Sequence, residues 1–178
     1  MTLLELTLAL PLLLVALAMM SQLMIAGRAT KRASAETWQA SSAAADVLER
    51  MHNAEFRDLF ALYNGDPFDD PGGPGTAPGQ SFAVEGLLPV EGDSGGFVGE
   101  ILLPITNVGT AVAPVFELRE DLNLPDLGLP RDLTGDQLID HQDHAADFTL
   151  FPVIVRLRWR GPYGPREYRV STLLSEMR

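Results

Sequence analysis

The first 27 residues read MTLLELTLALPLLLVALAMMSQLMIAG, and this stretch decides how the rest of the chain is organised. It contains no charged residue from Leu6 to Gly27. A helix rises about 1.5 Å per residue, so about 20 apolar residues are enough to cross the hydrocarbon core of a bilayer. The sequence therefore predicts a membrane-crossing helix over residues 1–27. Pro11 lies inside it and predicts a kink or a melted turn near Leu8–Pro11.

Basic residues follow the apolar stretch instead of preceding it. Arg28, Lys31 and Arg32 come directly after it, whereas a secretory signal peptide begins with a basic region. The positive-inside rule would place these residues, and the chain that follows them, in the cytoplasm. We expect instead that a basic leader precedes Met1 in the encoded protein and is removed, which leaves the following chain outside the cytoplasm.

Glu5 is the one charged residue within the first 27 positions. A carboxylate in lipid is costly, and where one occurs it is usually functional. The nearest basic side chain, Arg28, lies a membrane's width along the helix, so we expect no positive partner for Glu5 within the chain. A positive group from another chain is then required, and the α-amino group of a neighbouring subunit suits that role.

The run Met1-Thr2-Leu3-Leu4-Glu5-Leu6, followed by an apolar helix, resembles the mature N-terminus of type IV pilins and type II secretion pseudopilins. In that family a prepilin peptidase cleaves before the first residue and methylates its amine. The glutamate at position five pairs with a neighbouring subunit's N-terminus during assembly. The resemblance therefore implies processing and N-methylation at Met1 and an assembly role for Glu5. The alternative is a plain signal anchor with a chance acidic residue.

Apolar residues recur at spacings of three and four after Arg28, which predicts that the helix continues beyond the membrane as an amphipathic helix. These residues are Trp38, Ala44, Val47, Leu48 and Met51. The turn sequence Asn-Gly-Asp-Pro at 64–67 predicts that the helix ends near Tyr63. The chain then divides into a membrane or filament-core half of the helix (1–27), a soluble half (28–64) and a β-rich head with extended loops (65–178).

The end of the chain predicts a β-hairpin, and shorter β-compatible runs lie at 81–84, 97–103 and 115–118. In the hairpin, apolar residues alternate with polar ones from 153 to 160 and again from 168 to 174, around a turn at 161–164. Its arginines are Arg156, Arg158, Arg160, Arg166 and Arg169. They have two interpretations, a surface that docks an acidic neighbour and a solvated outer face of the sheet.

The hairpin adds to the family resemblance. Trp159 and the later run Arg-Glu-Tyr-Arg-Val-Ser-Thr-Leu at 166–173 resemble minor pilins and the I-type minor pseudopilins of type II secretion. The fold class expected is α+β, a long hydrophobic N-terminal helix packed on a small, mostly antiparallel sheet. The resemblance implies a single-pass protein of the bacterial inner membrane that enters an extracytoplasmic filament. Its partners would be homologous subunits, the prepilin peptidase, the inner-membrane assembly platform and, before assembly, membrane lipid.

Composition excludes several other classes of function. The formal net charge of -11 and the pI of about 4.5 make nucleic acid an unexpected partner, because a phosphate backbone would be repelled. The absence of cysteine excludes disulfides and thiolate metal sites. The sequence has no HExxH motif and no glycine-rich phosphate loop. We therefore expect a building block and not an enzyme.

Residues 132–143, DLTGDQLIDHQD, place oxygen-bearing side chains at positions 1, 3, 5, 9 and 12 of a twelve-residue loop. EF-hand-like loops wrap Ca²⁺ with this spacing, and they add a backbone carbonyl at position 7. The candidate ligands are Asp132, Thr134, Asp136, the Leu138 carbonyl, Asp140 and Asp143. The aspartate at position 12 resembles the dockerin form of the loop, whereas Gln137 stands at position 6, where glycine is usual.

Other interpretations stay open for this loop and for the chain. The loop is alternatively a solvated acidic turn capped by Asp132 or Asp136. His141 and His144, with the nearby aspartates 140, 143 and 147, also suit zinc or a hydrolytic metal centre. For the whole chain, the alternative function is a monomeric calcium- or ligand-binding module that a signal anchor holds outside the cytoplasm.

Overall fold

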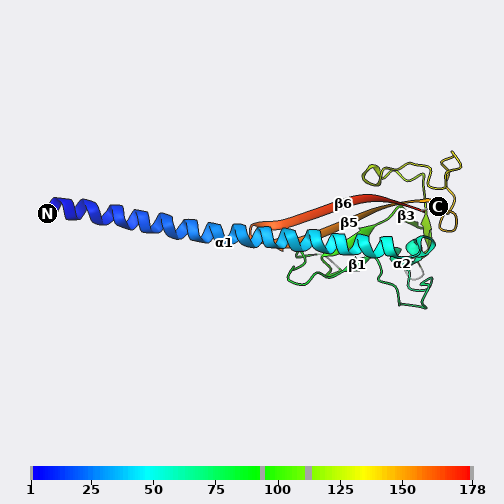
Figure 1. The fold of residues 1–178 in the computed structure, drawn as a ribbon, viewed down its shortest axis with the longest axis horizontal. Coiled ribbons are helices and arrows are strands. Elements are labelled where there is room, and N and C mark those ends of the chain that lie inside the picture. The colour runs from blue at the N-terminus through cyan, green and yellow to red at the C-terminus, as the bar shows by residue number, and fades with distance from the viewer. Residues whose placement is uncertain (1, 93–94, 111–113, 177–178) are drawn as a thin grey trace.

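The computed structural model describes residues 2–92, 95–110 and 114–176, and one long helix dominates its shape. Helix α1 runs from Leu3 to Asn53, which is 51 residues. At about 1.5 Å per residue its length is about 75 Å, far more than the width of a small domain. The head lies along its C-terminal half, and the N-terminal half extends alone (Figure 1). This arrangement confirms the predicted α+β class.

The two halves of α1 differ in what surrounds their apolar side chains. Between Leu8 and Ile25 the large apolar side chains are exposed, with values such as 68% for Leu12 and 73% for Leu23. Further along, a buried stripe covers the head, as the amphipathic pattern predicts. It consists of Glu36, Ala40, Ala44, Val47 and Met51. The prediction that Trp38 belongs to this stripe is wrong, because Trp38 is 71% exposed and lies on another face of the helix.

Helix α1 ends ten residues earlier than Tyr63, where the sequence predicted its end. Ala54 is extended, with φ -78° and ψ 160°, and the chain then forms a 3₁₀ turn, η1 (Phe56–Asp58), and a short helix, α2 (Leu59–Tyr63). The break folds α2 back so that Leu59, Phe60 and Tyr63 are buried. The turn sequence at 64–67 does end helical structure at Tyr63, but the helix that ends there is α2, because α1 has already broken at Ala54.

Pro11 does not interrupt α1, so the predicted melted turn near Leu8–Pro11 is wrong. The helical assignment is continuous through this position. Proline has a helical φ of about -65°, but inside a helix it removes one backbone donor and crowds the carbonyl four residues earlier, at a cost of about 3 kcal/mol or more. The intact turns on both sides of Pro11 show that the rest of the long helix outweighs this cost.

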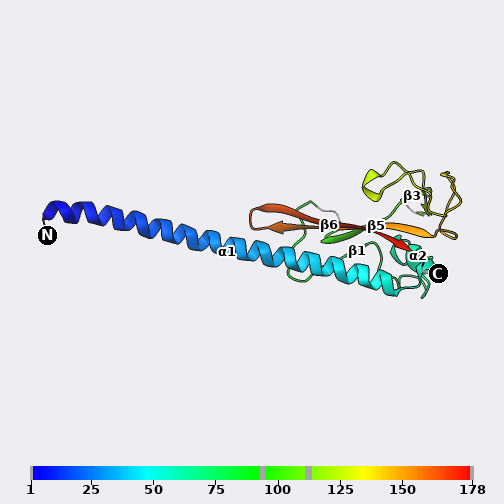
Figure 2. The same ribbon diagram turned by 45° about the horizontal axis from the view of Figure 1, so that its top comes forward.

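The main sheet has four antiparallel strands in the order β1-β2-β5-β6. Their bounds are Ser81–Phe82, Gly99–Leu102, Leu150–Gly161 and Gly164–Ser175. The C-terminal hairpin is confirmed, with Trp159 opposite Arg166 and Gly161 opposite Gly164. Figures 1 and 2 both show this hairpin lying along α1, with its turn pointing toward the N-terminus.

A second, two-stranded sheet pairs β3 (Ile105–Asn107) with β4 (Phe116–Leu118). The sequence predicted β4, within the run 115–118, but not β3. After β4 the chain passes through a 3₁₀ turn, η2 (Pro125–Leu127), and a long loop that leads to β5. These segments form the end of the molecule farthest from the N-terminus (Figure 1).

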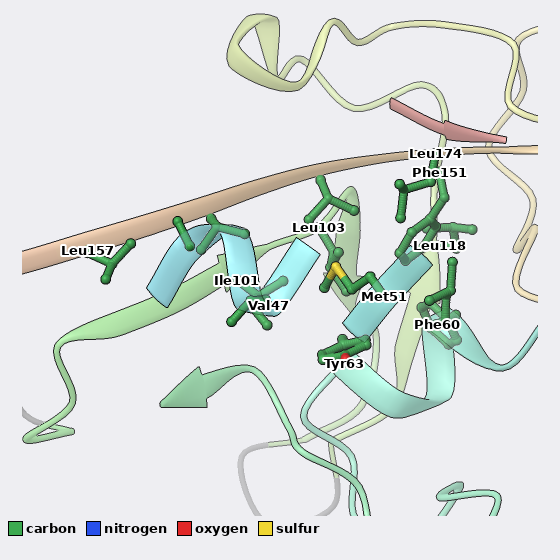
Figure 3. Close-up of a cluster of buried hydrophobic side chains, with 14 of the residues drawn as sticks. Val47, Met51, Phe60, Tyr63, Ile101, Leu103, Leu118, Phe151, Leu157 and Leu174 are labelled. Carbon is green, nitrogen blue, oxygen red and sulfur yellow. The ribbon is translucent and has the colours of Figure 1, made fainter. Parts of the chain in front are cut away.

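The core of the head lies between α1, α2 and the sheets, as Figure 3 shows. It draws side chains from segments that are far apart in the sequence. The residues labelled there are Val47, Met51, Phe60, Tyr63, Ile101, Leu103, Leu118, Phe151, Leu157 and Leu174. The second half of α1 is therefore part of the head, since its buried stripe completes this core.

The hairpin arginines find partners inside the head. Arg156 pairs with Glu100 at 2.6 Å, and Arg160 pairs with Glu91 at 2.7 Å. Arg169 pairs with Asp126 at 2.9 Å. Arginines that were predicted either to face solvent or to dock an acidic neighbour thus form ion pairs within the chain itself. Such ion pairs are weak where they are exposed.

Candidate functional site

The start of α1 holds Glu5 in a reciprocal capping arrangement. The Thr2 backbone N–H donates to Oε2 of Glu5 at 2.8 Å, and the Glu5 N–H donates to the Thr2 carbonyl at 3.0 Å. A carboxylate in the first turn also interacts favourably with the helix dipole. This cap satisfies one carboxylate oxygen of Glu5 but supplies no positive charge, so the expected positive partner from another chain stays a prediction. Met1, the predicted processing site, lies outside the described residues.

The apolar half of α1 is long and apolar enough to cross a membrane, and it is the one helix of the described residues with this property. The window that qualifies has no buried residue. Apolar surface in water is unfavourable by about 25 cal/mol per Å², so a row of exposed leucines and methionines requires an apolar environment. None of the described residues packs on this stretch to supply that environment.

Glu36 joins the hairpin to α1 at the point where the helix reaches the head. Its carboxylate is buried, with 5% of the residue exposed. The Trp159 indole N–H donates to Oε2 at 3.2 Å, and the Arg32 Nε–H donates to Oε1 at 2.8 Å. Arg166 covers the Trp159 ring at 5.7 Å and donates from Nη1 to the Ala33 carbonyl at 2.9 Å. These contacts fix the hairpin turn beside the helix.

Glu120, beyond the end of β4, organises the distal loops. It is 1% exposed, and both of its carboxylate oxygens accept backbone hydrogen bonds. Oε2 accepts from the Leu133 N–H at 2.9 Å, and Oε1 accepts from the Asp140 N–H at 2.8 Å. Glu120 was not among the residues predicted from the sequence. The alternation that buries Leu118 points Glu120 to the same side of the strand, and this signal could have identified it.

His144 lies beside Glu120 in the same buried cluster. Its Nε2 is 3.3 Å from Oδ1 of Asp140 and 3.5 Å from Oε1 of Glu120, and its Nδ1 is 3.2 Å from Oδ1 of Asp147. Burial lowers the pKa of the imidazole, but the hydrogen bond to Asp147 and the charge of Glu120 outweigh burial, so the pKa is raised. Glu120, Asp140 and His144 offer ligand atoms within 4.8 Å of one another, so this group could hold a metal ion.

The loop predicted to bind calcium curls around its first aspartate. Asp132 accepts backbone hydrogen bonds from Thr134 at 3.0 Å, Gly135 at 2.6 Å and Gln137 at 2.7 Å. The bond from Gly135 is the main reason that the pKa of Asp132 is lowered. Gln137 has φ 69°, a left-handed conformation that position 6 of an EF-hand-like loop requires and that glycine adopts more easily.

The other predicted ligands are divided between two places. Thr134 and Asp136 stay in the loop, where the Asp136 carboxylate accepts from the Leu138 N–H at 2.8 Å. Asp140 joins Glu120 and His144 in the buried cluster. Oδ1 of Asp143 accepts from the Leu118 N–H at 2.9 Å, which ties that residue to β4. The structure therefore places the predicted ligands in the distal loops with separate hydrogen-bond partners and does not gather them into one group.

Residues 92–96, Gly-Asp-Ser-Gly-Gly, match the GxSxG pattern of serine hydrolases. Asp93 and Ser94 lie outside the described residues. The pattern is informative where a strand leads into it and a helix follows. Here the chain continues into the strand β2, so the motif lacks that context.

Comparison with protein-family models, with curated proteins and with solved structures finds no match to this chain. The family resemblance rests on the first six residues, on the hairpin and on the shape of the molecule. A long apolar N-terminal helix joined to an antiparallel sheet is compatible with a pilin-like fold.

Proposed function

We propose that the chain is a structural subunit of a type IV pilus-like or type II secretion pseudopilus filament. It assembles through the N-terminal half of α1, and its role is structural and not enzymatic. The observation that carries the proposal is the contrast within α1, which exposes its apolar side chains at one end and buries them against the head at the other. A bilayer and then a filament core of sister helices would bury the exposed half in turn.

Glu5 gives the assembly its register. In the separate chain its carboxylate caps the Thr2 N–H and remains exposed, so it is accessible to a cation from another chain. A methylated amine at Met1 of a neighbouring subunit is the proposed partner. An ion pair in an apolar environment is favourable when it is complete and costly when one partner is missing, so it selects one axial position of the helices.

The proposed partners follow from this role. A prepilin peptidase would process Met1, an inner-membrane platform would move the subunit out of the bilayer, and homologous subunits would surround it afterwards. The subunit would reside in a bacterial inner membrane as a single-pass protein with its head outside the cytoplasm. The apolar span followed directly by Arg28 and a folded head supports the single-pass arrangement.

Substitutions of Glu5 in the native host test the proposal. Glu5→Ala and Glu5→Gln should both reduce the amount of the chain in sheared filaments, because neither provides a negative charge. Glutamine still accepts a hydrogen bond from the Thr2 N–H, so it separates the charge from the capping role. Glu49→Ala removes an exposed carboxylate from the same helix and should leave incorporation unchanged. Normal incorporation of Glu5→Ala would contradict the proposal, and rescue by Glu5→Gln would reduce Glu5 to a helix cap.

Mass spectrometry of the N-terminus separates this function from the alternative, a monomeric binding module held by a signal anchor. A filament subunit should begin at Met1 with a methylated amine. An unprocessed start with a normally folded head would favour the anchored module.

The distal loops support calcium binding as a second proposed property. The observation in its favour is Gln137, whose left-handed φ of 69° at position 6 lets the loop close around Asp132. The proposed ligands are the carboxylates of Asp132, Asp136, Asp140 and Asp143, the Thr134 hydroxyl and the Leu138 carbonyl, and Ca²⁺ would have to draw Asp140 and Asp143 away from their present partners to gather all six. Oxygen donors of this kind suit Ca²⁺, whereas the mixed oxygen and nitrogen donors of Glu120, Asp140 and His144 suit a transition metal.

Two variants distinguish these metal sites, because each removes a ligand that the other site lacks. Calcium in the loop predicts that Asp132→Asn abolishes thermal stabilisation of the chain by Ca²⁺ and that His144→Gln preserves it. A transition-metal site predicts stabilisation by Zn²⁺ that is lost in His144→Gln and kept in Asp132→Asn. The absence of any calcium-dependent heat or stabilisation at millimolar Ca²⁺ would contradict the calcium proposal.

A further inference from the structure

The turn of the β5–β6 hairpin lies close to the end of the membrane-crossing segment. Figures 1 and 2 show this turn as the part of the head nearest the N-terminus, alongside α1. Arg166, just after the turn, donates to the Ala33 carbonyl at 2.9 Å. Ala33 is six residues beyond Gly27, or about 9 Å along the helix axis at about 1.5 Å per residue. The headgroup layer of a leaflet extends about 5–8 Å beyond the hydrocarbon. The turn begins at Gly164, two strand residues or about 6–7 Å closer to the N-terminus than Arg166, so it lies at the level of this layer when the span ends at Gly27.

The side chains at this level are those that favour a lipid headgroup layer. Tyr163 is at the apex of the turn and is 73% exposed. Tyrosine is enriched at membrane interfaces, because its ring is apolar and its hydroxyl is polar. Arg28 and Lys31 are exposed on α1, and no ion pair is found for either within the described residues. The neighbouring Arg32 is 65% exposed even though it pairs with the buried Glu36.

Charge is distributed unevenly along the molecule, and the basic end is the one that faces the membrane. Segments 28–38 and 158–167 contain six basic residues and two glutamates, and Glu91 adds one further carboxylate, paired with Arg160. Residues 114–149, at the opposite end of the head, contain nine carboxylates and two arginines. An anionic surface would attract the first end and repel the second, which orients the head upright.

We propose that the hairpin turn and the first turn of α1 beyond the span form a headgroup-binding collar for anionic phospholipid. Tyr163 enters the headgroup layer, while Arg28 and Lys31 contact lipid phosphates. The collar holds the head against the membrane before the subunit leaves the bilayer. The inference rests on the membrane-crossing role of α1 and not on Glu5 or on filament formation.

The full-length chain tests this directly, because it contains no cysteine and accepts single cysteine labels. Tyr163→Cys carries an environment-sensitive fluorophore, and the chain is reconstituted in vesicles that contain a headgroup spin-labelled lipid quencher. Phe68→Cys, at a site that is 80% exposed on another loop, is the matched control. Quenching should be stronger at 163 than at 68, and stronger with phosphatidylglycerol present than with phosphatidylcholine alone.

Removing the charges of the collar sharpens the result. Arg28→Gln with Lys31→Gln should reduce quenching at 163 in anionic vesicles to the level seen in neutral ones. Equal quenching at 163 and 68, or no difference between the two lipid compositions, would overturn the collar. Co-flotation of the labelled chain with vesicles reports insertion separately. Normal flotation without quenching refutes only the collar, whereas failure to float contradicts the membrane-crossing role itself.

Discussion

The two halves of α1 have similar local structure and opposite surroundings. From Leu8 to Ile25 the helix exposes leucine and methionine side chains on every side, whereas from Glu36 to Met51 it buries one stripe and exposes the rest. A helix that is apolar all round requires an apolar environment on all sides, and a helix with one apolar stripe requires it on one. The head supplies that one side for the second half. No described residue of the head supplies an apolar side for the first half, and lipid or other chains would do so under the proposed function.

The strongest test of this contrast compares two leucine truncations. One is in the core of the head that covers the second half of α1, and the other is in the exposed first half of α1. Leu157 is fully buried where β5 meets the core, so Leu157→Ala should lower the free energy of unfolding of the head by about 2–5 kcal/mol. Leu14 is 60% exposed, and Leu14→Ala should change the free energy of unfolding of the head by less than about 0.5 kcal/mol. Denaturant titration of the full chain in detergent micelles measures both. Equal losses would mean that the apolar half is packed on the head.

A charge in the apolar half should affect the membrane and leave the head intact. Leu14→Arg should disfavour insertion by about 2.5–3.5 kcal/mol, the cost of an arginine near the centre of a membrane helix. Leu173→Arg, on the outer face of β6 where the side chain is 42% exposed, is the control. Flotation with vesicles reports insertion. If both variants floated like the wild type, the helix would not be a membrane span.

The contact between the hairpin and α1 should contribute less than the core. Glu36→Leu leaves the buried Trp159 N–H without its acceptor, so we expect a loss of about 1–3 kcal/mol in the free energy of unfolding. Glu49→Leu, at an exposed position of the same helix, should cost less than about 0.5 kcal/mol. The intrinsic fluorescence of the tryptophans during denaturation reports both changes. A Glu36 variant as stable as the Glu49 variant would show that the contact is dispensable.

The strained position in the distal loop should give the smallest change, and it has the opposite sign. Gln137→Gly should stabilise the metal-free head by up to about 1 kcal/mol, because glycine adopts a positive φ without steric cost. Gln142→Gly, at a loop residue with negative φ, should destabilise slightly. Thermal unfolding in the presence of a chelator measures both. Destabilisation by Gln137→Gly would mean that the loop does not hold this conformation in solution.

Sequence patterns were enough to predict the elements whose apolar residues recur with a regular period. The apolar run at the start, the stripe through Val47 and Met51, and the alternation of the hairpin each extend over several turns or residue pairs, so their periods could be recognised. Trp38 was misplaced because it is two residues from the buried Ala40, which puts it on another face of the helix.

Tertiary contacts account for what the sequence did not predict. The break at Ala54 depends on the burial of α2, and no residue at the break itself indicates it. The cluster of Glu120 with Asp140 and His144 joins residues about 20 positions apart through backbone hydrogen bonds that only the folded loops create. Glu36 was overlooked for a related reason, since its partner Trp159 lies on the last hairpin.

Electron cryo-microscopy of the assembly from the native host would test the central proposal most directly. We predict a filament in which the apolar halves of α1 from neighbouring subunits surround one another, with each Glu5 within ion-pair distance of another subunit's N-terminal amine. A chain found only as single copies in the membrane, or a filament whose apolar helices face solvent, would contradict it.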